Sequence, residues 1–411
     1  MSSIAGICDF SDENLARLIY ALVWDEIRSL RGGVAVSVAA QGNDVFATRV
    51  RKEDDNTLNT LGLDSLELIG VTTRLNELFQ VSSTGFEDLL LGARKMSHWK
   101  DILLKARVVN DQSLTFRTSG STGEPKRCTH TLADLTEEAQ CWLNTFGSPE
   151  RLISLVSPHH LYGFMFTALL PCLCKTEVVD LWHHRYGILK TSGIEDLRIE
   201  EGDWLIATPF MLSQSLSGFD AIPPNVLIIS STEPMGEILA QGLTDKGFGD
   251  VIDIYGCSEY GGIGYRRVPY EDSFNLLPGL DVSEDGDTLT RNGQSFRTLD
   301  RLQRVEQGKF KICGRRDKGL QIAGINVFPE NIAQKIKELP YIRDCKIEIG
   351  EDKAQLAPQY LKAVIVPEID MPIHKAESEL RQWCGLNLNA SEKPASFVFV
   401  NEEAMSGTVN A

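Results

Sequence analysis

The sequence predicts an α/β protein built on a mainly parallel sheet flanked by helices, with a small α+β module at its C-terminus. The chain has 411 residues, too many for one small core, so two or three domains are expected. In its middle part, short apolar runs alternate with amphipathic segments, which is the rhythm of βαβ units. We therefore divide the chain into residues 1–105, 106–313 and 314–411.

The first part is predicted to be mainly helical. Apolar residues recur at helical spacing in Leu15–Ile27 and in Leu66–Phe79, and Phe86–Ile102 is a further candidate helix. Val34–Phe46 is more strand-like. The first part is thus expected either to complete the core of the middle part or to form a small domain of its own.

The middle and last parts supply the sheets. Five apolar runs are predicted to be buried strands: Leu152–Val156, Glu177–Asp180, Trp204–Ala207, Val226–Ser230 and Val251–Ile254. The segments between them are long enough for helices, so these strands are expected to run parallel. After Gly314, the pattern predicts helices at Pro329–Leu339 and Lys375–Cys384 and strands at Cys345–Ile349 and Leu361–Val366.

Composition and charge narrow the classes of partner. Hydrophobic residues make up 42% and charged residues 24%, which is ordinary for a globular protein. The net charge of −16 makes nucleic acid and anionic membranes poor candidate partners. No signal peptide or membrane-spanning run is visible. The nine cysteines are odd in number and lack a Cys-x-x-Cys pair, which favours reduced thiols and a cytoplasmic location over disulfides or structural zinc.

The most informative run is Thr118–Lys126, which reads Thr-Ser-Gly-Ser-Thr-Gly-Glu-Pro-Lys. Its glycines allow the backbone to approach a ligand closely, and its N–H groups and hydroxyls can form a concavity suited to phosphate oxygens. Lys126 adds a mobile positive charge. The run is not a P-loop, because no Gly-Lys-Ser/Thr follows at the required spacing. The alternative is a surface loop rich in serine, threonine and glycine.

With Arg117 before it and Arg127 after it, this run closely resembles the phosphate-binding loop of the acyl-adenylate-forming superfamily. That superfamily contains acyl-CoA synthetases, peptide-synthetase adenylation domains and luciferases. The resemblance extends over about residues 115–400, and Asn326–Pro329 is most similar to the phenylacetate–CoA ligase branch. It implies a truncated version of the superfamily's core with a mobile C-terminal lid. The residues that would hold the phosphates of ATP are Thr118, Ser119, Gly120, Ser121, Thr122, Gly123 and Lys126.

The segment Tyr255–Glu259 resembles the Tyr-Gly-x-Ser/Thr-Glu motif of the same superfamily. Attack of a carboxylate on the α-phosphate builds negative charge, which a metal and hydroxyls must offset. The resemblance implies that Tyr255 and Gly256 lie against adenine, that Ser258 approaches the α-phosphate and that Glu259 holds Mg²⁺, a hard cation that prefers oxygen. The alternative is a strand end followed by a turn, with Gly261 and Gly262 continuing the loop.

Further motifs follow in the order that the superfamily has them. His160, in Ser157–Gly163, resembles the histidine beside the acyl carboxylate; the alternative is a surface histidine pair ending a strand. Ser231 falls where relatives have a small-residue turn against adenine. Asp300 resembles the aspartate that binds both ribose hydroxyls, although Leu299 replaces the usual glycine. In Gly314-Arg315-Arg316-Asp317, the resemblance assigns Arg315 to ribose or phosphate and Asp317 to the hinge of the lid.

Two departures from the superfamily pattern are visible. Thr408 stands where relatives carry a C-terminal lysine that reaches the reacting carboxylate, and only 117 residues precede Thr118. Within this short front part, Leu61–Leu68 resembles the attachment site of an acyl carrier protein, with Ser65 as the acceptor of phosphopantetheine. The alternative is a helix N-cap at Asp64 or Ser65.

The expected function is that of an AMP-forming acid–thiol ligase. ATP with Mg²⁺ would activate a carboxylic acid, which the Asn326–Pro329 resemblance implies is aromatic, and CoA or a carrier phosphopantetheine would accept the acyl group. His160, Lys126 and Glu259 are the candidate catalytic residues. The alternative is an adenylate-binding or carrier-type protein with impaired adenylation, which the replacement of lysine by Thr408 favours.

Overall fold

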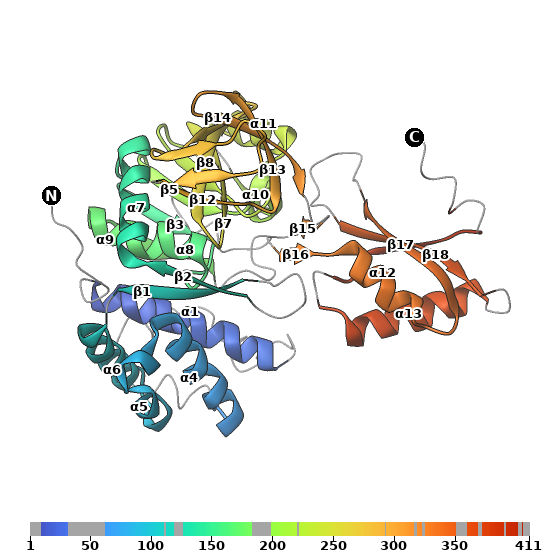
Figure 1. Ribbon diagram of the computed structural model, residues 1–411, viewed down its shortest axis with the longest axis horizontal. Helices are drawn as coiled ribbons and strands as arrows, with labels where there is room; N and C mark the ends of the chain where they lie inside the picture. The colour runs from blue at the N-terminus through green and yellow to red at the C-terminus, as the bar shows by residue number, and fades with distance from the viewer. Residues whose placement is uncertain are drawn as a thin grey trace.

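The computed structural model describes residues 10–31, 62–110, 112–118, 126–182, 199–219, 222–291, 293–315, 319–322, 325–350, 360–368, 372–389, 392–401 and 405. A large body holds most of these residues, and a smaller C-terminal unit lies to one side of it (Figure 1). The expected strand at Val34–Phe46 lies outside the described residues.

A nine-stranded sheet runs through the large body in the order β13-β14-β9-β8-β7-β6-β5-β3-β4. One half of it is parallel and contains the five predicted strands. These are β3 (Arg151–Ser154), β4 (Glu177–Asp180), β5 (Asp203–Ala207), β6 (Leu227–Ser230) and β7 (Asp250–Cys257). Their runs of buried Leu, Ile, Val and Trp explain why the sequence identified them.

The other half of the sheet is antiparallel. It contains β8 (Gly261–Val268), β9 (Phe274–Leu276), β13 (Asp300–Glu306) and β14 (Lys309–Arg315). In β13 and β14 most side chains are at least partly exposed, and only Leu302 and Phe310 are buried. Without a continuous apolar run, these strands gave no clear signal in the sequence.

The front helices lie beneath a β-hairpin and share one hydrophobic core with the large sheet (Figure 1). They are α1 (Asp12–Leu30), α4 (Ser65–Phe79), α5 (Glu87–Gly92) and α6 (Met96–Val109). The hairpin consists of β1 (Ser113–Thr118) and β2 (Lys126–Thr131). The expected boundary between residues 105 and 106 falls inside α6. A shared core is what the core-completing interpretation of the front part requires.

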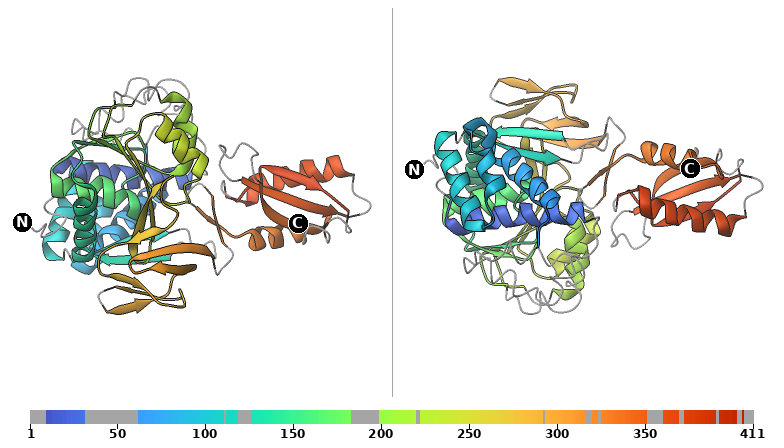
Figure 2. Two further views of the ribbon diagram at one scale, coloured as in Figure 1. Left: turned by 90° about the horizontal axis from the view of Figure 1, so that it is seen from above. Right: turned by 90° about the horizontal axis from the view of Figure 1, so that it is seen from below.

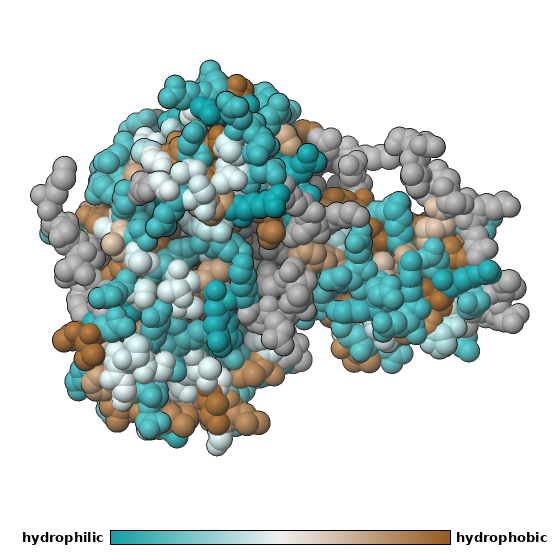
Figure 3. Space-filling model, in the orientation of Figure 1, coloured by the Kyte–Doolittle hydropathy of each residue, from teal (hydrophilic) through white to brown (hydrophobic). Residues whose placement is uncertain are grey.

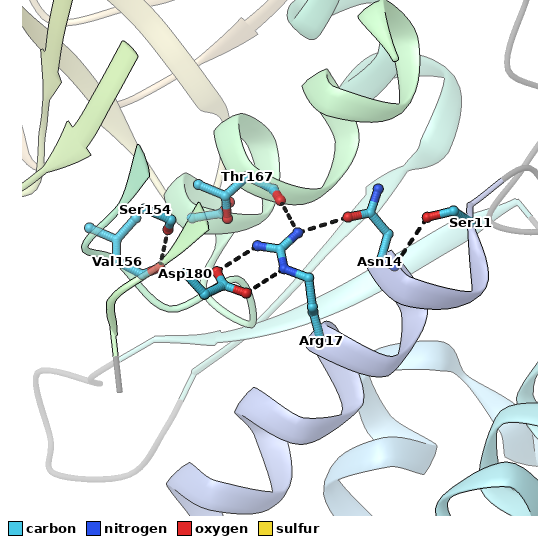
Figure 4. Close-up of polar contacts among 8 residues, drawn as sticks. Ser11, Asn14, Arg17, Ser154, Val156, Thr167 and Asp180 are labelled. Carbon is cyan, nitrogen blue, oxygen red and sulfur yellow. Dashed lines mark hydrogen bonds and ion pairs between the residues drawn. The ribbon is translucent and has the colours of Figure 1, made fainter. Parts of the chain in front are cut away.

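Buried polar contacts anchor α1 to the sheet. Arg17 lies within α1 and forms a two-pronged ion pair with Asp180 at the end of β4, with Nη2 2.7 Å from Oδ1 (Figure 4). Its Nη1 donates to the carbonyl of Thr167 at 2.9 Å and to Oδ1 of Asn14 at 2.7 Å. Ser11 caps the start of α1 by accepting from the N–H of Asn14. The charge of Arg17 is therefore matched and the helix is fixed in position.

Other helices and a small sheet cover the large body. The helices are α7 (Leu132–Phe146), α8 (Leu161–Phe164), α9 (Leu170–Cys174), α10 (Pro209–Ser215) and α11 (Glu237–Asp245). A π-helical segment, Met165–Leu169, joins α8 to α9. Short 3₁₀ turns occur at Val81–Thr84 and Leu216–Gly218. The small sheet contains β10 (Leu280–Val282), β11 (Leu289–Arg291) and β12 (Gln294–Phe296).

The C-terminal unit has a hydrophobic core of its own. Its ribbon stands apart from the large body in both views of Figure 2. Its sheet contains β17 (Ile342–Gly350), β18 (Tyr360–Pro367) and β19 (Ser396–Phe399), and its helices are α12 (Pro329–Lys337) and α13 (Ile373–Asn387). The two-stranded β15 (Leu320–Ile322) and β16 (Ile325–Val327) precede α12. The four elements predicted after Gly314 are confirmed, whereas β19 was not predicted.

The surface in Figure 3 is mainly hydrophilic, and apolar residues gather along the lower edge, over the front helices. The exposed apolar side chains of these helices include Leu66 and Ile69 of α4 and Val108 of α6. Among the described helices, none has both the length and the apolar character needed to cross a membrane. The eight cysteines of the described residues are all free.

Candidate active site

The tips of two hairpins meet at the candidate site. Thr118 and Lys126 form the last pair of the β1–β2 ladder, so the phosphate-loop run closes this hairpin. In the β7–β8 hairpin, Cys257 pairs with Gly261 and leaves Glu259 in the turn. Lys126 Nζ donates to Glu259 Oε1 at 2.8 Å. Two motifs more than a hundred residues apart therefore meet through opposite charges.

The electrostatics of this pair suit a site for phosphate and metal. Burial is the largest single effect on the half-buried Glu259 and would raise its pKa, but its hydrogen bonds, including that from Lys126, and the charge of Lys126 together outweigh burial, so the net pKa is lowered. The same hydrogen bond raises the pKa of Lys126. Glu259 is thus an anion at neutral pH that is already neutralised by a cation. A carboxylate in this state fits a Mg²⁺ ligand, because the ammonium can turn to phosphate when the ion binds.

The β7–β8 turn is also held by contacts that the sequence did not identify. His130, on β2, lies with Nε2 2.6 Å from the carbonyl oxygen of Ser258. Burial lowers the pKa of His130, which favours the neutral ring. Glu138, on α7, accepts from the N–H of Gly262 at 2.9 Å. Neither His130 nor Glu138 belongs to a recognised motif, so only the tertiary structure reveals these contacts.

Glycine is required where the turn approaches Glu138. Gly261 has φ of +79°, and a Cβ there would lie 2.3 Å from Oε2 of Glu138. On the other side, Arg291 donates to the carbonyls of Tyr260 at 2.8 Å and Gly262 at 2.6 Å. The ring of Tyr260 stacks on Phe296 of the small sheet, with centroids 3.9 Å apart. The turn that carries Glu259 is therefore fixed on both sides.

The predicted adenine and ribose residues also come together. Tyr255 OH donates to Oδ2 of Asp300 at 2.7 Å, and Arg315 Nη1 lies 4.0 Å from Oδ1 of the same carboxylate. Asp300 and Arg315 are partners across the β13–β14 ladder. Burial, together with the charge of Asp300, raises the pKa of Tyr255, so its phenol remains a hydrogen-bond donor.

The turn after β6 borders the same strands. Ser231 is buried, and its Oγ donates to the carbonyl of Ile254 at 2.9 Å, one residue before Tyr255. Thr232 has φ of +83°, which is strained for a β-branched residue. Such strain persists only where the surrounding structure imposes it, and it is concentrated at functional sites.

His160 stands at the start of α8, after β3. It is the N-cap residue of this helix, and its ring lies against that of His159, with centroids 4.0 Å apart. His159 is buried, whereas His160 is exposed. No described contact joins His160 to Lys126, Glu259 or Tyr255, so its predicted role beside the acid stays a prediction.

Several predicted residues can be placed only in part. Ser119, Gly120, Ser121, Thr122 and Gly123, as well as Asp317 and Thr408, lie outside the described residues. Gly256 lies in β7, where a Cβ would approach the carbonyl oxygen of Gly261 to 2.6 Å. Ser65 is the first residue of α4 and is exposed, whereas Asp64 is the residue that caps this helix. The alternative that Asp64 is the N-cap of this helix is therefore confirmed.

Comparison with known proteins agrees with this geometry. The family described as AMP-binding enzyme matches residues 87–285. The chain is 33% identical over 355 residues to the 4-coumarate–CoA ligase of Cereibacter sphaeroides, covering 85% of this chain and 82% of that protein. It is 30% identical to the 4-coumarate–CoA ligase of Halorhodospira halophila, covering 93% of this chain and 94% of that protein. These matches cover most of both chains, so the short front part does not set this chain apart from these relatives.

Solved structures show the same fold. The o-succinylbenzoate CoA synthetase of Bacillus subtilis superimposes with a TM-score of 0.56 at 18% identity, covering 70% of this chain and 65% of that chain. A malonyl-CoA ligase superimposes with a TM-score of 0.54 at 19% identity, covering 70% of each chain. The chain therefore belongs to the AMP-binding, acyl-adenylate-forming enzymes and is an AMP-forming acid–thiol ligase of the acyl-CoA synthetase type.

Proposed function

We propose that this protein joins an aromatic carboxylic acid of the 4-coumarate class to CoA, at the expense of ATP. A carboxylate oxygen of the acid attacks the α-phosphorus, and pyrophosphate leaves. The thiol sulfur of CoA then attacks the acyl carbonyl carbon, AMP leaves, and the thiol proton passes to solvent. The main observation behind this proposal is the hydrogen bond from Lys126 Nζ to Glu259 Oε1, 2.8 Å long, at the end of the phosphate-loop hairpin.

The phosphate side of the reaction is assigned to the two hairpins. Thr118, the run Ser119–Gly123 and Lys126 would hold the phosphates, and Ser258 would approach the α-phosphate. Glu259 would hold Mg²⁺ when Lys126 turns to the phosphates. Bound there, the ion offsets the negative charge that builds on the phosphate during the attack. Most of the catalysis is then positioning and charge stabilisation.

The nucleoside side is assigned to β7, β13 and β14. Asp300 would accept hydrogen bonds from the ribose hydroxyls, with Arg315 beside it, and Tyr255 with Gly256 and Ser231 would border adenine. The buried phenol of Tyr255 fixes one oxygen of Asp300 at 2.7 Å. The other oxygen is 4.0 Å from Arg315, which leaves room for a hydroxyl to compete for it.

The acid side is assigned to His160, and the substrate class comes from the relatives. Two proteins that are 30–33% identical to this chain are called 4-coumarate–CoA ligases. The ring of His160 lies against that of His159, tilted by 42°, and an imidazole offers both a flat face and a polar edge to an aromatic acid. Asp317 is proposed as the hinge that turns the C-terminal unit between the two half-reactions.

The test is acid-dependent exchange of pyrophosphate into ATP, with 4-coumarate, benzoate, phenylacetate, 2-succinylbenzoate and malonate compared. Exchange with 4-coumarate, followed by CoA ester formation, is the expected result. Exchange that is fastest with malonate would contradict the aromatic class. ATP binding without exchange for any acid would favour the alternative, an adenylate-binding protein with impaired adenylation, in which Thr408 replaces the lysine of relatives.

Transfer to a carrier phosphopantetheine rather than CoA is a second proposal for the acceptor. Ser65 is exposed at the start of α4, as a modification would require. However, Leu68, Val71, Leu75 and Leu78 of the same helix are buried in the core shared with the sheet. A carrier must move freely to deliver its acyl group, so these contacts favour CoA.

A further inference from the structure

The phosphate-loop hairpin has two faces that make different contacts. On one face, Lys126 and His130 reach the β7–β8 turn. On the other face, the neighbouring residues of the strands point to α4, because side chains alternate along a strand. Gln80, just after α4, donates to Thr115 at 2.9 Å and accepts from Ser113 at 3.0 Å. The front helices thus touch the hairpin on the side opposite Glu259.

Glu77 of α4 holds both strands of the hairpin together. Its carboxylate forms ion pairs with Arg117 of β1 through Oε2 and with Arg127 of β2 through Oε1. These two arginines are direct partners in the ladder, one step before the pair Thr118 and Lys126. The Glu77 side chain is 8% exposed. A single buried carboxylate therefore closes the base of the phosphate loop, and the arginines on either side of the run are directed to it.

Asp25 of α1 holds the histidine pair on the acid side. Its Oδ2 is 3.2 Å from Nε2 of His159, whose Nδ1 is 2.6 Å from the hydroxyl of Ser157. His159 thus has a polar group near each ring nitrogen, with a hydrogen bond at Nδ1 and the Asp25 carboxylate close to Nε2, and its ring lies against that of His160. The orientation of the exposed histidine thus depends on a carboxylate in the first helix.

Arg74 links Glu77 to helix α1. On α4, it lies 3.4 Å from Glu77 and 3.4 Å from Glu26, the neighbour of Asp25 on α1. Its side chain is almost fully buried, so its charge must be matched by these carboxylates. The charges of Glu77, Arg74 and Glu26 thus form a continuous series between the hairpin and α1.

From these contacts we infer that the front helices position both substrates through two carboxylates: Glu77 sets the phosphate loop for ATP, and Asp25 sets His159 and His160 for the acid. Both are positioning residues, because each acts through another side chain. The inference rests on the proposed function for the identity of the two substrates. It gives the front part a role beyond completing the core.

The test measures the KM for ATP and for 4-coumarate in pyrophosphate exchange, together with the melting temperature. Glu77→Gln is expected to raise the KM for ATP about tenfold and to change the KM for 4-coumarate less than about twofold, since misplacement by an ångström can cost such factors. Asp25→Asn is expected to give the reverse pattern, so each variant is the control of the other. Glu26→Gln, which removes a partner of Arg74 but touches neither the hairpin nor His159, is expected to leave both KM values within about twofold.

A merely structural role would lower the melting temperature of both variants and leave the two KM values unchanged, which would overturn the inference. A rise of both KM values in each variant would overturn the division between the two carboxylates. Should Glu77→Gln not fold, Glu77→Gln/Arg127→Gln restores the charge balance and is judged by the same KM values. If the wild-type protein exchanges no pyrophosphate, the proposed function fails; calorimetric binding of ATP with Mg²⁺ and of 4-coumarate then decides the inference by the same pattern.

Discussion

Lys126 and Glu259 keep each other in place at the point where ATP is expected to bind. Lys126 is the first residue of β2 and Glu259 lies in the turn between β7 and β8, and their contact joins the ends of two hairpins. On the proposed function, Lys126 would exchange Glu259 for phosphate and Glu259 would exchange Lys126 for Mg²⁺. Such an exchange would need little reorganisation of the backbone, and preorganisation of this kind is the main source of electrostatic catalysis.

Removing either charge should therefore reduce adenylate formation without unfolding the protein. Glu259→Gln and Lys126→Ala are each expected to lower the exchange rate on the order of 10²-fold, the usual cost of losing one electrostatic contact to a transition state. Circular dichroism should remain native, because Lys126 is largely exposed. Lys100→Ala, which removes the surface pair with Asp12, is the matched control. Exchange rates near that of the wild-type protein in both variants would remove these residues from the mechanism.

Ser65 and Asp64 allow a sharper test of the carrier hypothesis. Asp64 accepts hydrogen bonds from the N–H groups of Leu66 and Glu67, both at 2.8 Å, and Glu67 closes the capping box. Asp64→Ala should therefore cost about 1 kcal/mol of unfolding free energy, and Ser65→Ala much less. Treatment with a phosphopantetheinyl transferase and CoA should leave the intact mass unchanged. One added phosphopantetheine that Ser65→Ala abolishes would instead establish a carrier.

At the scale of single elements, predictability from the sequence followed the way each element is stabilised. Most residues of the parallel strands β3, β5 and β6 are buried and apolar, and α1 and α4 have apolar faces at helical spacing, so the local pattern was sufficient to predict them. In contrast, β13 and β14 have few buried side chains, and they are held by pairing with each other and, through β14, with β9. Glu259 could be predicted because it lies in a motif. Glu138 and His130 could not, because their roles depend on contacts with residues distant in the chain.

The position of α1 depends on the buried pair of Arg17 and Asp180. Removing one partner of such a pair leaves an unmatched charge, so Arg17→Met is expected to lower the unfolding free energy by about 3 kcal/mol. Arg17→Met/Asp180→Leu should recover part of this loss, because the second substitution removes the unmatched carboxylate. Urea unfolding measures both values. A loss below about 0.5 kcal/mol for Arg17→Met, as for an exposed pair, would show that other contacts fix α1.

At the scale of the whole molecule, the described residues form two large cores that belong to different parts of the chain. One core contains buried side chains from Phe10 to Phe310, and the other contains side chains from Val327 to Leu388. Because neither core includes residues of the other, the C-terminal unit can change its orientation without disrupting either core. This is a requirement of the proposed hinge at Asp317.

Two matched substitutions test this independence. Ile336 and Ile228 are both fully buried, one in each core. Ile336→Ala and Ile228→Ala should each cost about 2–5 kcal/mol. Differential scanning calorimetry of the full chain should show two transitions, with Ile336→Ala lowering only one of them and Ile228→Ala only the other. A single transition that both variants shift equally would mean that the two parts unfold together.

The anchoring of α1 also has a consequence for the time course of synthesis. Arg17 and its partner Asp180 are separated by 163 residues, so the ion pair cannot form until that stretch has been translated. At about 5–20 residues per second, this delay is on the order of ten seconds. During that interval Leu18, Ile19 and Leu22, which are fully or almost fully buried in the finished protein, have no sheet to cover them. Because the partner of Arg17 is synthesised so much later, α1 offers a chaperone an extended period for binding.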